Sequence, residues 1–350
     1  MTDSQGSAAA RAPAASSWAL LRLVVRFARF PTLILVYLHM LFFALCLDLG
    51  AADVDGWLLL RLAGGVAAMT LCYANATAVN DLSDEQTDAI NLAGDPSRPL
   101  VCGAAGRRQV QAVAVGTGVA CVAASLLVGP WAVVASVAML GLNVVYSLPP
   151  TRISGRGALA QALLPLEYCA YPAALVALAC GGWSGTYAAV VASMYLIFVG
   201  RVFCKDIRDE VGDRATGKLT YVVRHSKRAA IAQSAVWTIV GTVALSVVMF
   251  ARMDANPAFV FGFCALSLAG QVAALVQCDR EPTTGTAVLY TGIYGRWISM
   301  KVLFYVMLIV LARSGADFST ECVVLGLMVV AIVANVLMLY DNVARERRAA

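Results

Sequence analysis

Residues 57–79 of the chain read WLLLRLAGGVAAMTLCYANATAV, and residues 80–88, which follow at once, read NDLSDEQTD. The first stretch is long and apolar enough to cross a bilayer as a helix, because about 20 apolar residues span the hydrocarbon core. The second stretch is polar and acidic. A membrane span that ends in a cluster of carboxylates predicts a chemical site at one face of the membrane.

The apolar pattern recurs along the whole chain. Of its 350 residues 60% are apolar and 13% are charged, and the mean hydropathy is +0.76. Soluble domains carry about 25% charged residues, so lipid is the expected solvent for most of this surface. The ten candidate spans lie at about 31–49, 57–79, 109–128, 131–146, 158–179, 186–204, 229–250, 258–277, 297–312 and 318–340. They predict an all-α, polytopic bundle of nine or ten transmembrane helices, of which the fourth and ninth are short.

The N-terminal segment differs in composition from the spans. Residues 1–17 are rich in Ala and Ser and lack the apolar region of a cleavable signal, so we expect a disordered cytoplasmic tail. Residues 18–30 place arginines among apolar residues at near-helical spacing, which predicts an interfacial helix before the first span. Residues 18–350 are then expected to form a single transmembrane domain.

The distribution of basic residues predicts how the chain is oriented. With the N-terminus inside, the inner segments carry 23 of the 26 Lys and Arg residues. This asymmetry follows the positive-inside rule. It places residues 80–108, 147–157 and 201–228, as well as both termini, on the cytoplasmic face of an integral membrane protein.

Several other classes of site are disfavoured. The ten cysteines occur singly, mostly within apolar runs, and no CxxC pair is present. Only two histidines occur, which disfavours a histidine-based metal site. The basic residues are not clustered with stacking aromatics, so we expect no nucleic-acid partner.

Two cytoplasmic segments carry the same acidic pattern, Asp-x-x-Asp-x-x-x-Asp. It begins at Asp81 in residues 80–88 and at Asp206 in residues 205–213. On a helix this spacing stacks three carboxylates on one face. One copy alone is more often a solvated helix end. Two copies on the same side, each after an even-numbered span, favour a functional pair.

Stacked carboxylates repel one another unless a cation lies between them. Mg²⁺ takes one or two carboxylates together with phosphate oxygens and waters, so the two stacks can hold a diphosphate through metal ions. Bound metal would neutralise charge on the diphosphate as it leaves. The candidate catalytic carboxylates are Asp84, Asp88, Asp209 and Asp213. Candidate phosphate-binding residues are Arg98, Lys205, Arg208, Arg214 and Lys218, although Arg98 and Lys218 could equally be ordinary positive-inside residues.

At these residues the chain resembles the UbiA-type superfamily of intramembrane prenyltransferases, from about Arg22 to Val223. The matching segments are Asn80-Asp81-x-x-Asp84-x-x-x-Asp88 with Ser97-Arg98-Pro99-Leu100, Tyr146-Ser147-Leu148-Pro149-Pro150-x-Arg152, and Lys205-Asp206-Ile207-x-Asp209-x-x-x-Asp213-Arg214-x-x-Gly217-Lys218.

The resemblance implies a helical bundle around a central cavity, capped by cytoplasmic loops or helices. It implies Mg²⁺-dependent transfer of a prenyl group from a prenyl diphosphate to a lipophilic acceptor, often aromatic, within the membrane. By motif match, one metal site would use Asn80, Asp81, Asp84 and Asp88, and the other Asp206, Asp209 and Asp213. Two or more Mg²⁺ ions are therefore expected.

Aromatic residues in the early spans are candidates to line the prenyl and acceptor cavity. They are Tyr73, Tyr146, Tyr168, Tyr171 and Tyr195. Their ring faces could stabilise an allylic cation, although packing is the commoner role of any single one. Glu167 lies inside the fifth span, where a carboxylate is a functional candidate by default. A structural hydrogen-bonding role is equally compatible with its position.

Three alternatives remain open from the sequence. The same architecture could cyclise a prenyl chain without an acceptor, as an intramembrane terpene cyclase. The chain could also be a non-catalytic isoprenoid-binding protein or a transporter. A transporter is expected to carry its ionisable residues near the middle of the bilayer, whereas these acids lie at helix ends. The pattern therefore favours an enzyme.

Overall fold

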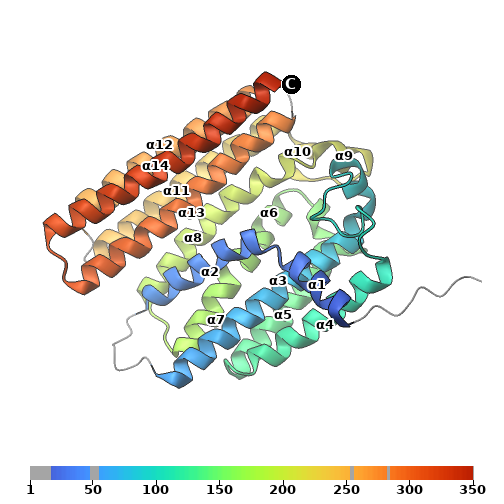
Figure 1. Cartoon of the computed structure of the whole chain (residues 1–350), viewed down its shortest axis with the longest axis horizontal. Helices are drawn as coiled ribbons and strands as arrows, with labels where there is room; N and C mark the ends of the chain where they lie inside the picture. Colours follow the sequence, from blue (N-terminus) through green and yellow to red (C-terminus); the bar gives the residue numbers. More distant parts are fainter. Residues whose placement is uncertain (1–16, 48–54, 253–255, 282–283, 350) are drawn as a thin grey trace, which may run out of the picture.

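The computed structural model describes residues 17–47, 55–252, 256–281 and 284–349. Within these ranges every regular element is a helix, which confirms the all-α prediction. Figure 1 shows one bundle in which α11–α14 stack along one side of the earlier helices. The expected tail, residues 1–17, lies outside the described residues except for Ser17.

The helices have the following bounds. They are α1 (Ser17–Ala28), α2 (Phe30–Leu45), α3 (Gly56–Asn91), α4 (Arg107–Ser125), α5 (Pro130–Ser147), α6 (Ala158–Pro165), α7 (Tyr171–Cys180), α8 (Gly185–Phe203), α9 (Glu210–Ala215), α10 (Tyr221–Arg224), α11 (Lys227–Arg252), α12 (Pro257–Arg280), α13 (Thr284–Ser314) and α14 (Phe318–Ala349). A π-helical turn, Leu166–Ala170, joins α6 to α7, so the two form one span.

Each of the ten expected apolar runs coincides with a helix. In the described part of the chain, eight helices are long and apolar enough to cross a membrane. The pair α1 and α2, bent by 64°, would bring the number to nine. The expected span at 109–128 forms α4, which is not among these eight because it begins with two arginines and is rich in small residues. The two runs considered short, at 131–146 and 297–312, both belong to full spans.

Helix α13 departs most from its predicted bounds. It begins at Thr284 rather than near 297, so Arg296 lies inside a span instead of before it. Lys301 is fully buried, and its Nζ donates to the Thr242 hydroxyl and to Gln271 Oε1. The predicted start of this span was wrong because the charge of Arg296 lowers the local hydropathy, although the helix continues through that residue.

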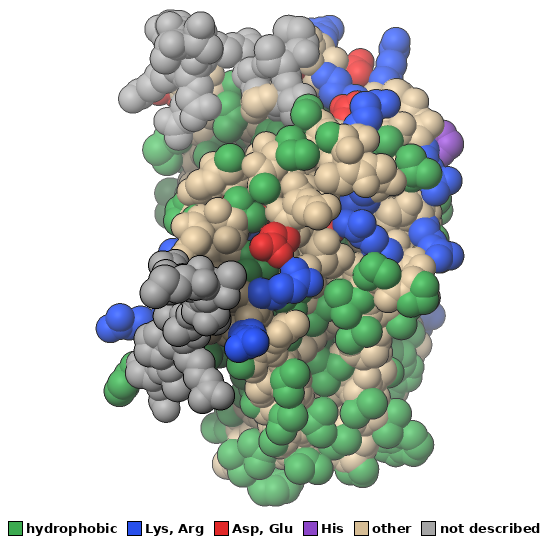
Figure 2. All heavy atoms as spheres, turned by 90° about the vertical axis from the view of Figure 1, so that its right-hand side faces the viewer, with side chains coloured by type: hydrophobic (Ala, Val, Ile, Leu, Met, Phe, Trp, Pro, Cys, Tyr) green, Lys and Arg blue, Asp and Glu red, His purple; other side chains and the backbone are tan. Residues whose placement is uncertain are grey.

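The length of α3 positions the acidic end of the second span. The helix has 36 residues, and at about 1.5 Å per residue it is roughly 54 Å long, well beyond the ~30 Å of a hydrocarbon core. Its last three turns therefore project beyond the apolar part of the bundle. Figure 1 shows α9, α10 and the loop after α3 at this same end. Figure 2 views that end and shows Lys and Arg side chains over its upper and middle part, with hydrophobic side chains below.

Candidate active site

The two acidic motifs meet at one cavity of about 100 Å³. Helix α3 contributes side chains to it, as do α5, α6 and the segment that contains the second motif. Its polar lining includes Asn80, Asp84, Asp88, Arg98, Lys205, Arg208, Asp209, Asp213 and Lys218. Tyr73, Tyr146, Glu167 and Tyr168 line its deeper, more apolar part, together with Met139, Leu142, Leu163 and Leu164. The cavity thus has a charged mouth and an apolar interior.

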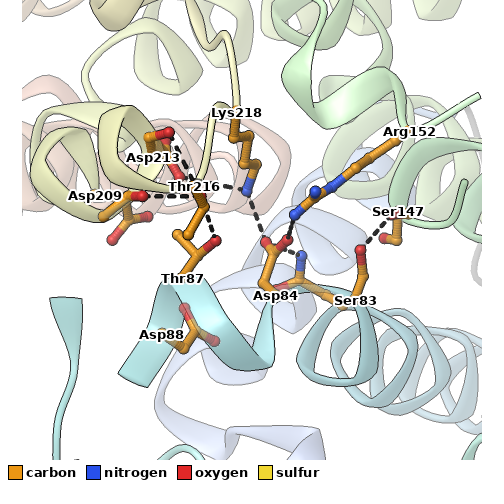
Figure 3. Close-up of polar contacts among 12 residues, drawn as sticks. Ser83, Asp84, Thr87, Asp88, Ser147, Arg152, Asp209, Asp213, Thr216 and Lys218 are labelled. Carbon is orange, nitrogen blue, oxygen red and sulfur yellow. Dashed lines mark hydrogen bonds and ion pairs between the residues drawn. The ribbon is translucent and has the colours of Figure 1, made fainter. Parts of the chain in front are cut away.

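Asp84 is the most heavily contacted carboxylate of the cavity. Its Oδ2 accepts a hydrogen bond from Lys218 Nζ at 2.7 Å and its Oδ1 accepts one from Arg152 Nη2 at 2.9 Å. Asn80 Nδ2 donates to the same carboxylate at 3.0 Å. Figure 3 shows Lys218 and Arg152 both reaching the Asp84 carboxylate, each from a different segment. Two cations thus hold this carboxylate in place, together with an amide from one helical turn earlier.

Asp213 lies on the other side of Lys218 and is nearly free of hydrogen bonds. The side chain is buried, neither of its oxygens has a hydrogen-bond partner, and its nearest cation is Lys218, at 3.7 Å. Burial raises the pKa of Asp213 to about 7, and Lys218 opposes that rise. A buried carboxylate without partners is costly, so Asp213 is suited to receive a metal ion.

Asp209 has a different electrostatic environment. Burial alone would raise its pKa, but hydrogen bonds from Arg208 at 2.8 and 3.2 Å, with the charges of Lys205 and Lys218, outweigh burial and lower it. The side chain is therefore charged at neutral pH. Asp209 and Asp213, four residues apart, thus have pKa values shifted in opposite directions.

The first aspartate of each motif does not line the cavity. Asp81 is buried against Arg98 Nη1 at 2.6 Å and Arg29 Nη2 at 3.3 Å. Asp206 accepts a hydrogen bond from Gln161 Nε2 at 2.8 Å. Both carboxylates are therefore occupied in holding neighbouring elements.

Arg214 also lies outside the cavity. Its guanidinium is exposed and pairs with Glu210 at 3.0 Å within α9. Its position offers no contact with a diphosphate in the cavity.

Three polar contacts join the last turns of α3 to the segment that carries the second motif. Asn91, the last residue of α3, donates from Nδ2 to the Asp209 carbonyl at 2.9 Å and accepts from the Gly212 amide at 2.7 Å. The hydroxyls of Thr87 and Thr216 lie 2.9 Å apart. A Cβ on Gly212 would lie 2.6 Å from the Asn91 amide nitrogen, so only glycine fits there. These contacts fix the second motif against the end of α3.

The expected cavity tyrosines divide into two groups. Tyr73 and Tyr168 form an edge-to-face pair with ring centroids 6.0 Å apart, and both line the cavity, as does Tyr146. Tyr171 instead bonds to Ser136 at 2.8 Å, and Tyr195 to the carbonyl of Ala162 at 2.5 Å. Neither of these two lines the cavity, and their contacts are those of packed structural tyrosines.

Glu167 also lines the cavity. The side chain is buried, and its Oε1 has no hydrogen-bond partner. It sits in the π-helical turn between α6 and α7, a local widening that is frequent at functional sites. Glu167 is therefore the acid within the apolar interior that is best placed to accept a proton.

The donor set fits Mg²⁺ ions that bind together with a diphosphate. Among the described residues, no three His, Cys, Asp or Glu side chains already converge on one point. Mg²⁺ needs only one or two carboxylates when phosphate oxygens and waters complete the octahedron. Asp213, with two unbonded buried oxygens, fits that requirement.

Two basic residues of the site were not among the predicted ones. Arg29 lines the cavity and was interpreted as part of an interfacial helix. It occupies the bend between α1 and α2 with φ 44°, which turns its side chain toward Asp81. Arg152 contacts Asp84 and lies within the segment Tyr146–Arg152 that carries the resemblance, so its signal was present in the sequence.

The sequence matches one family model and several curated proteins. The model, described as the UbiA prenyltransferase family, matches residues 38–293. A digeranylgeranylglyceryl phosphate synthase of Natronomonas pharaonis is 27% identical over 250 residues, 69% of this chain and 84% of the relative. A protein of the same name from Halobacterium salinarum is 31% identical over 233 residues, 65% of this chain and 79% of that one.

Solved structures share the fold at lower identity. A digeranylgeranylglyceryl phosphate synthase superposes with a TM-score of 0.61 at 15% identity, over 83% of this chain and 98% of that structure. A UbiA homologue from Archaeoglobus fulgidus, bound to DMAPP and Mg²⁺, gives a TM-score of 0.56 at 14% identity, over 80% and 98%. The matched family region ends at residue 293, so α14 and most of α13 lie beyond it.

Proposed function

This chain belongs to the UbiA prenyltransferase family, and from that premise we propose that its cavity binds a prenyl diphosphate through Mg²⁺ ions held by Asp84, Asp88, Asp209 and Asp213. The observation that carries the proposal is the convergence of both motifs on one cavity, with buried Asp213 oxygens left unbonded. The chain is an integral membrane prenyltransferase.

The residues around the cavity have different proposed roles. When bound, Mg²⁺ supplies charge neutralisation on the diphosphate as the carbon–oxygen bond breaks. Arg98, Lys205, Arg208 and Lys218 line the same mouth and are placed to contact phosphate oxygens. The rings of Tyr73 and Tyr168 face the apolar interior, where a carbon centre that gains positive charge would lie. The apolar walls exclude water that would otherwise capture that centre.

The acceptor is proposed from the relatives. The curated proteins that match are named digeranylgeranylglyceryl phosphate synthases. That name favours a lipid carrying glyceryl phosphate as the acceptor here, over the aromatic acceptor that the resemblance alone suggested. Glu167 is proposed to accept the proton that the acceptor loses, because it is buried, lines the cavity and has an oxygen unbonded.

Product analysis tests the proposal. The purified protein, in detergent with Mg²⁺, is incubated with prenyl diphosphates of several chain lengths and with acceptors of both classes. Mass spectrometry is expected to find an acceptor carrying a prenyl group, with loss of product in EDTA and recovery on adding Mg²⁺. Diphosphate release should be slow when no acceptor is present. Steady release without an acceptor, together with a cyclic terpene, would favour a cyclase.

Sidedness is a second part of the proposal. The acidic motifs and the end of α14 lie at the same end of the bundle (Figure 1), and the basic asymmetry assigns that end to the cytoplasm. Single-cysteine variants Asp95→Cys and Arg348→Cys, in a background in which all ten native cysteines are replaced, should resist an impermeant thiol reagent in intact cells. Trp183→Cys, in an exposed turn before α8, should react. Labelling of position 95 from outside would overturn this orientation.

A further inference from the structure

A second cavity lies beside the first, between α2, α6, α8 and α13. Its volume is about 350 Å³. It shares Leu164, Tyr168 and Lys205 with the first cavity, so these three side chains lie between the two. Its remaining wall is largely apolar, with Leu35, Val36, Phe198, Val202 and Ile298, and it contains two arginines, Arg201 and Arg296.

The two cavities differ in how their cations are paired. Each basic residue that lines the first cavity forms an ion pair with an acidic side chain: Arg29, Arg98, Lys205, Arg208 and Lys218. Within the described chain, neither Arg201 nor Arg296 has an ion pair with an acid. The second cavity therefore has a net positive charge that the protein itself does not neutralise.

Arg201 is held in position by its neighbours, but one of its buried donors has no hydrogen-bond partner. Its guanidinium lies over the Tyr294 ring, 5.9 Å from the centroid, and its Nη1 is buried without a hydrogen-bond partner. Gly295 makes room for it, because a Cβ there would lie 2.9 Å from Arg201 Nε. The absence of a side chain at Gly295 therefore allows the Arg201 guanidinium to lie against α13 beside the cavity.

Unpaired arginines within membrane spans are costly and mark binding sites. Arg201 lies two residues before the C-terminal end of α8, and Arg296 lies in the first half of α13; both helices are long and apolar enough to be spans. A guanidinium matches the geometry of a phosphate and binds it through two parallel hydrogen bonds. The missing partner is therefore an anion with several oxygens, carried on a molecule whose other part is apolar.

We propose that Arg201 and Arg296 bind the phosphate of the lipid acceptor in this second cavity, while the prenyl diphosphate occupies the first. The inference rests on the proposed prenyl transfer and adds to it the residues that select an anionic acceptor. The donor already has five paired cations and two acidic motifs in the first cavity. The apolar wall of the second suits the acceptor's hydrocarbon chain, and the shared residues bring the two substrates side by side.

The test compares an alkyl glyceryl phosphate with the matching alkylglycerol, which lacks the phosphate. Arg201→Gln and Arg296→Gln are each expected to raise the KM for the phosphate-bearing acceptor about tenfold, the effect of losing ~1.4 kcal/mol of binding. The KM for the prenyl diphosphate should stay unchanged. Both variants should treat the neutral acceptor as the unaltered protein does. A higher KM for the diphosphate, with no change for the acceptor, would assign the arginines to the donor and overturn the inference.

Two further variants separate binding from folding. Gly295→Ala keeps both arginines and favours the helix, but it displaces the Arg201 guanidinium, so it should also raise the acceptor KM severalfold. Arg252→Gln removes an exposed arginine at the far end of α11 and should change nothing. If Arg201→Gln does not fold, Gly295→Ala and Arg201→Lys still decide the matter: unchanged acceptor KM in both would overturn it.

A binding measurement distinguishes this inference from the proposed function. Native mass spectrometry without donor or Mg²⁺ should show the alkyl glyceryl phosphate bound to the unaltered protein and lost from the double variant. Such binding in a protein that transfers no prenyl group would leave the site standing and remove the proposed function. Equal retention of phosphatidylglycerol and of the acceptor analogue, with unchanged acceptor KM in the variants, would make the site a structural lipid site and overturn the inference.

Discussion

The two aspartate motifs have the same spacing but different backbones. The first lies on the continuous helix α3, where Asp81, Asp84 and Asp88 follow one another on adjacent turns. The second begins in a 3₁₀ turn, Lys205–Ile207, is interrupted at Asp209 and continues into the short helix α9. The sequence predicted a stack of carboxylates for each motif, which the first backbone matches and the second does not.

Despite this difference, the side chains of the two motifs are used alike. In each, the first aspartate is turned away to contact neighbouring elements, and the other two line the cavity. On the helix, Asp81 shares a face with Asp84 and Asp88 but lies further from the end of α3, where Arg98 and Arg29 hold it. In the broken segment the backbone changes direction between Asp206 and Asp213. The comparison teaches that the spacing specifies which carboxylates meet the ligand, while the local backbone is set by packing.

The largest expected effect comes from removing a lining carboxylate. Asp84→Asn and Asp209→Asn should each lower kcat at least about a hundredfold, because loss of a charged metal ligand removes several kcal/mol of leaving-group stabilisation. Asp81→Asn and Asp206→Asn should lower it about tenfold or less, and lower the Tm instead, since they remove contacts between elements. Steady-state rates and thermal unfolding measure both.

Equal loss of kcat in all four variants would contradict the division of each motif into one structural and two metal-binding aspartates. It would mean that Asp81 and Asp206 turn toward the metal when substrate binds. Retention of the ordinary rate in Asp84→Asn would remove the first motif from the metal site.

The second prediction uses the contrast between Asp213 and Asp209. The pKa of Asp213 is raised to about 7 by burial, whereas that of Asp209 is lowered. Below about pH 7, Mg²⁺ must therefore displace a proton from Asp213. The Mg²⁺ concentration for half-maximal activity should then rise about tenfold for each unit by which the pH falls. Above that pH it should be constant.

Calorimetry in two buffers of different ionisation enthalpy gives a direct check. With a non-hydrolysable diphosphate present, Mg²⁺ binding near pH 6 should release about one proton, and near pH 8 almost none. Asp213→Asn should abolish the release whether or not it is active. Proton release that is the same at both values would show that Asp213 is not a ligand.

The fold and the core of the site were largely predictable from sequence. Apolar runs identify the spans because the bilayer demands about 20 apolar residues from each. The spacing of Asp84 and Asp88 identifies the first motif because a regular helix converts spacing into geometry. The family resemblance supplied the reaction, and the family match confirms it.

What escaped the sequence depends on contacts between distant segments. Arg29 reaches Asp81 only because the chain bends at a left-handed residue between α1 and α2. Arg296 was placed before a span because its charge lowers a hydropathy window, although α13 carries it inside. The separation of Tyr146 from Tyr171 likewise needs the direction of each side chain, which composition does not give.

The smallest effect is expected at the joint between the motifs. Asn91→Ala removes two hydrogen bonds, to the Asp209 carbonyl and from the Gly212 amide, and each is worth about 0.5–1.5 kcal/mol. No ligand is lost, so kcat at saturating Mg²⁺ should fall only about twofold. The second motif would be held less firmly, and the Mg²⁺ concentration for half-maximal activity should rise about fivefold. Gln86→Ala, an exposed change on the same helix, should alter neither quantity.

If Asn91→Ala lowers kcat as strongly as Asp209→Asn, the Asn91 contacts belong to the reacting centre rather than to its support. If Asn91→Ala has no effect on the Mg²⁺ requirement, the two motifs act independently and share only the spacing of their aspartates.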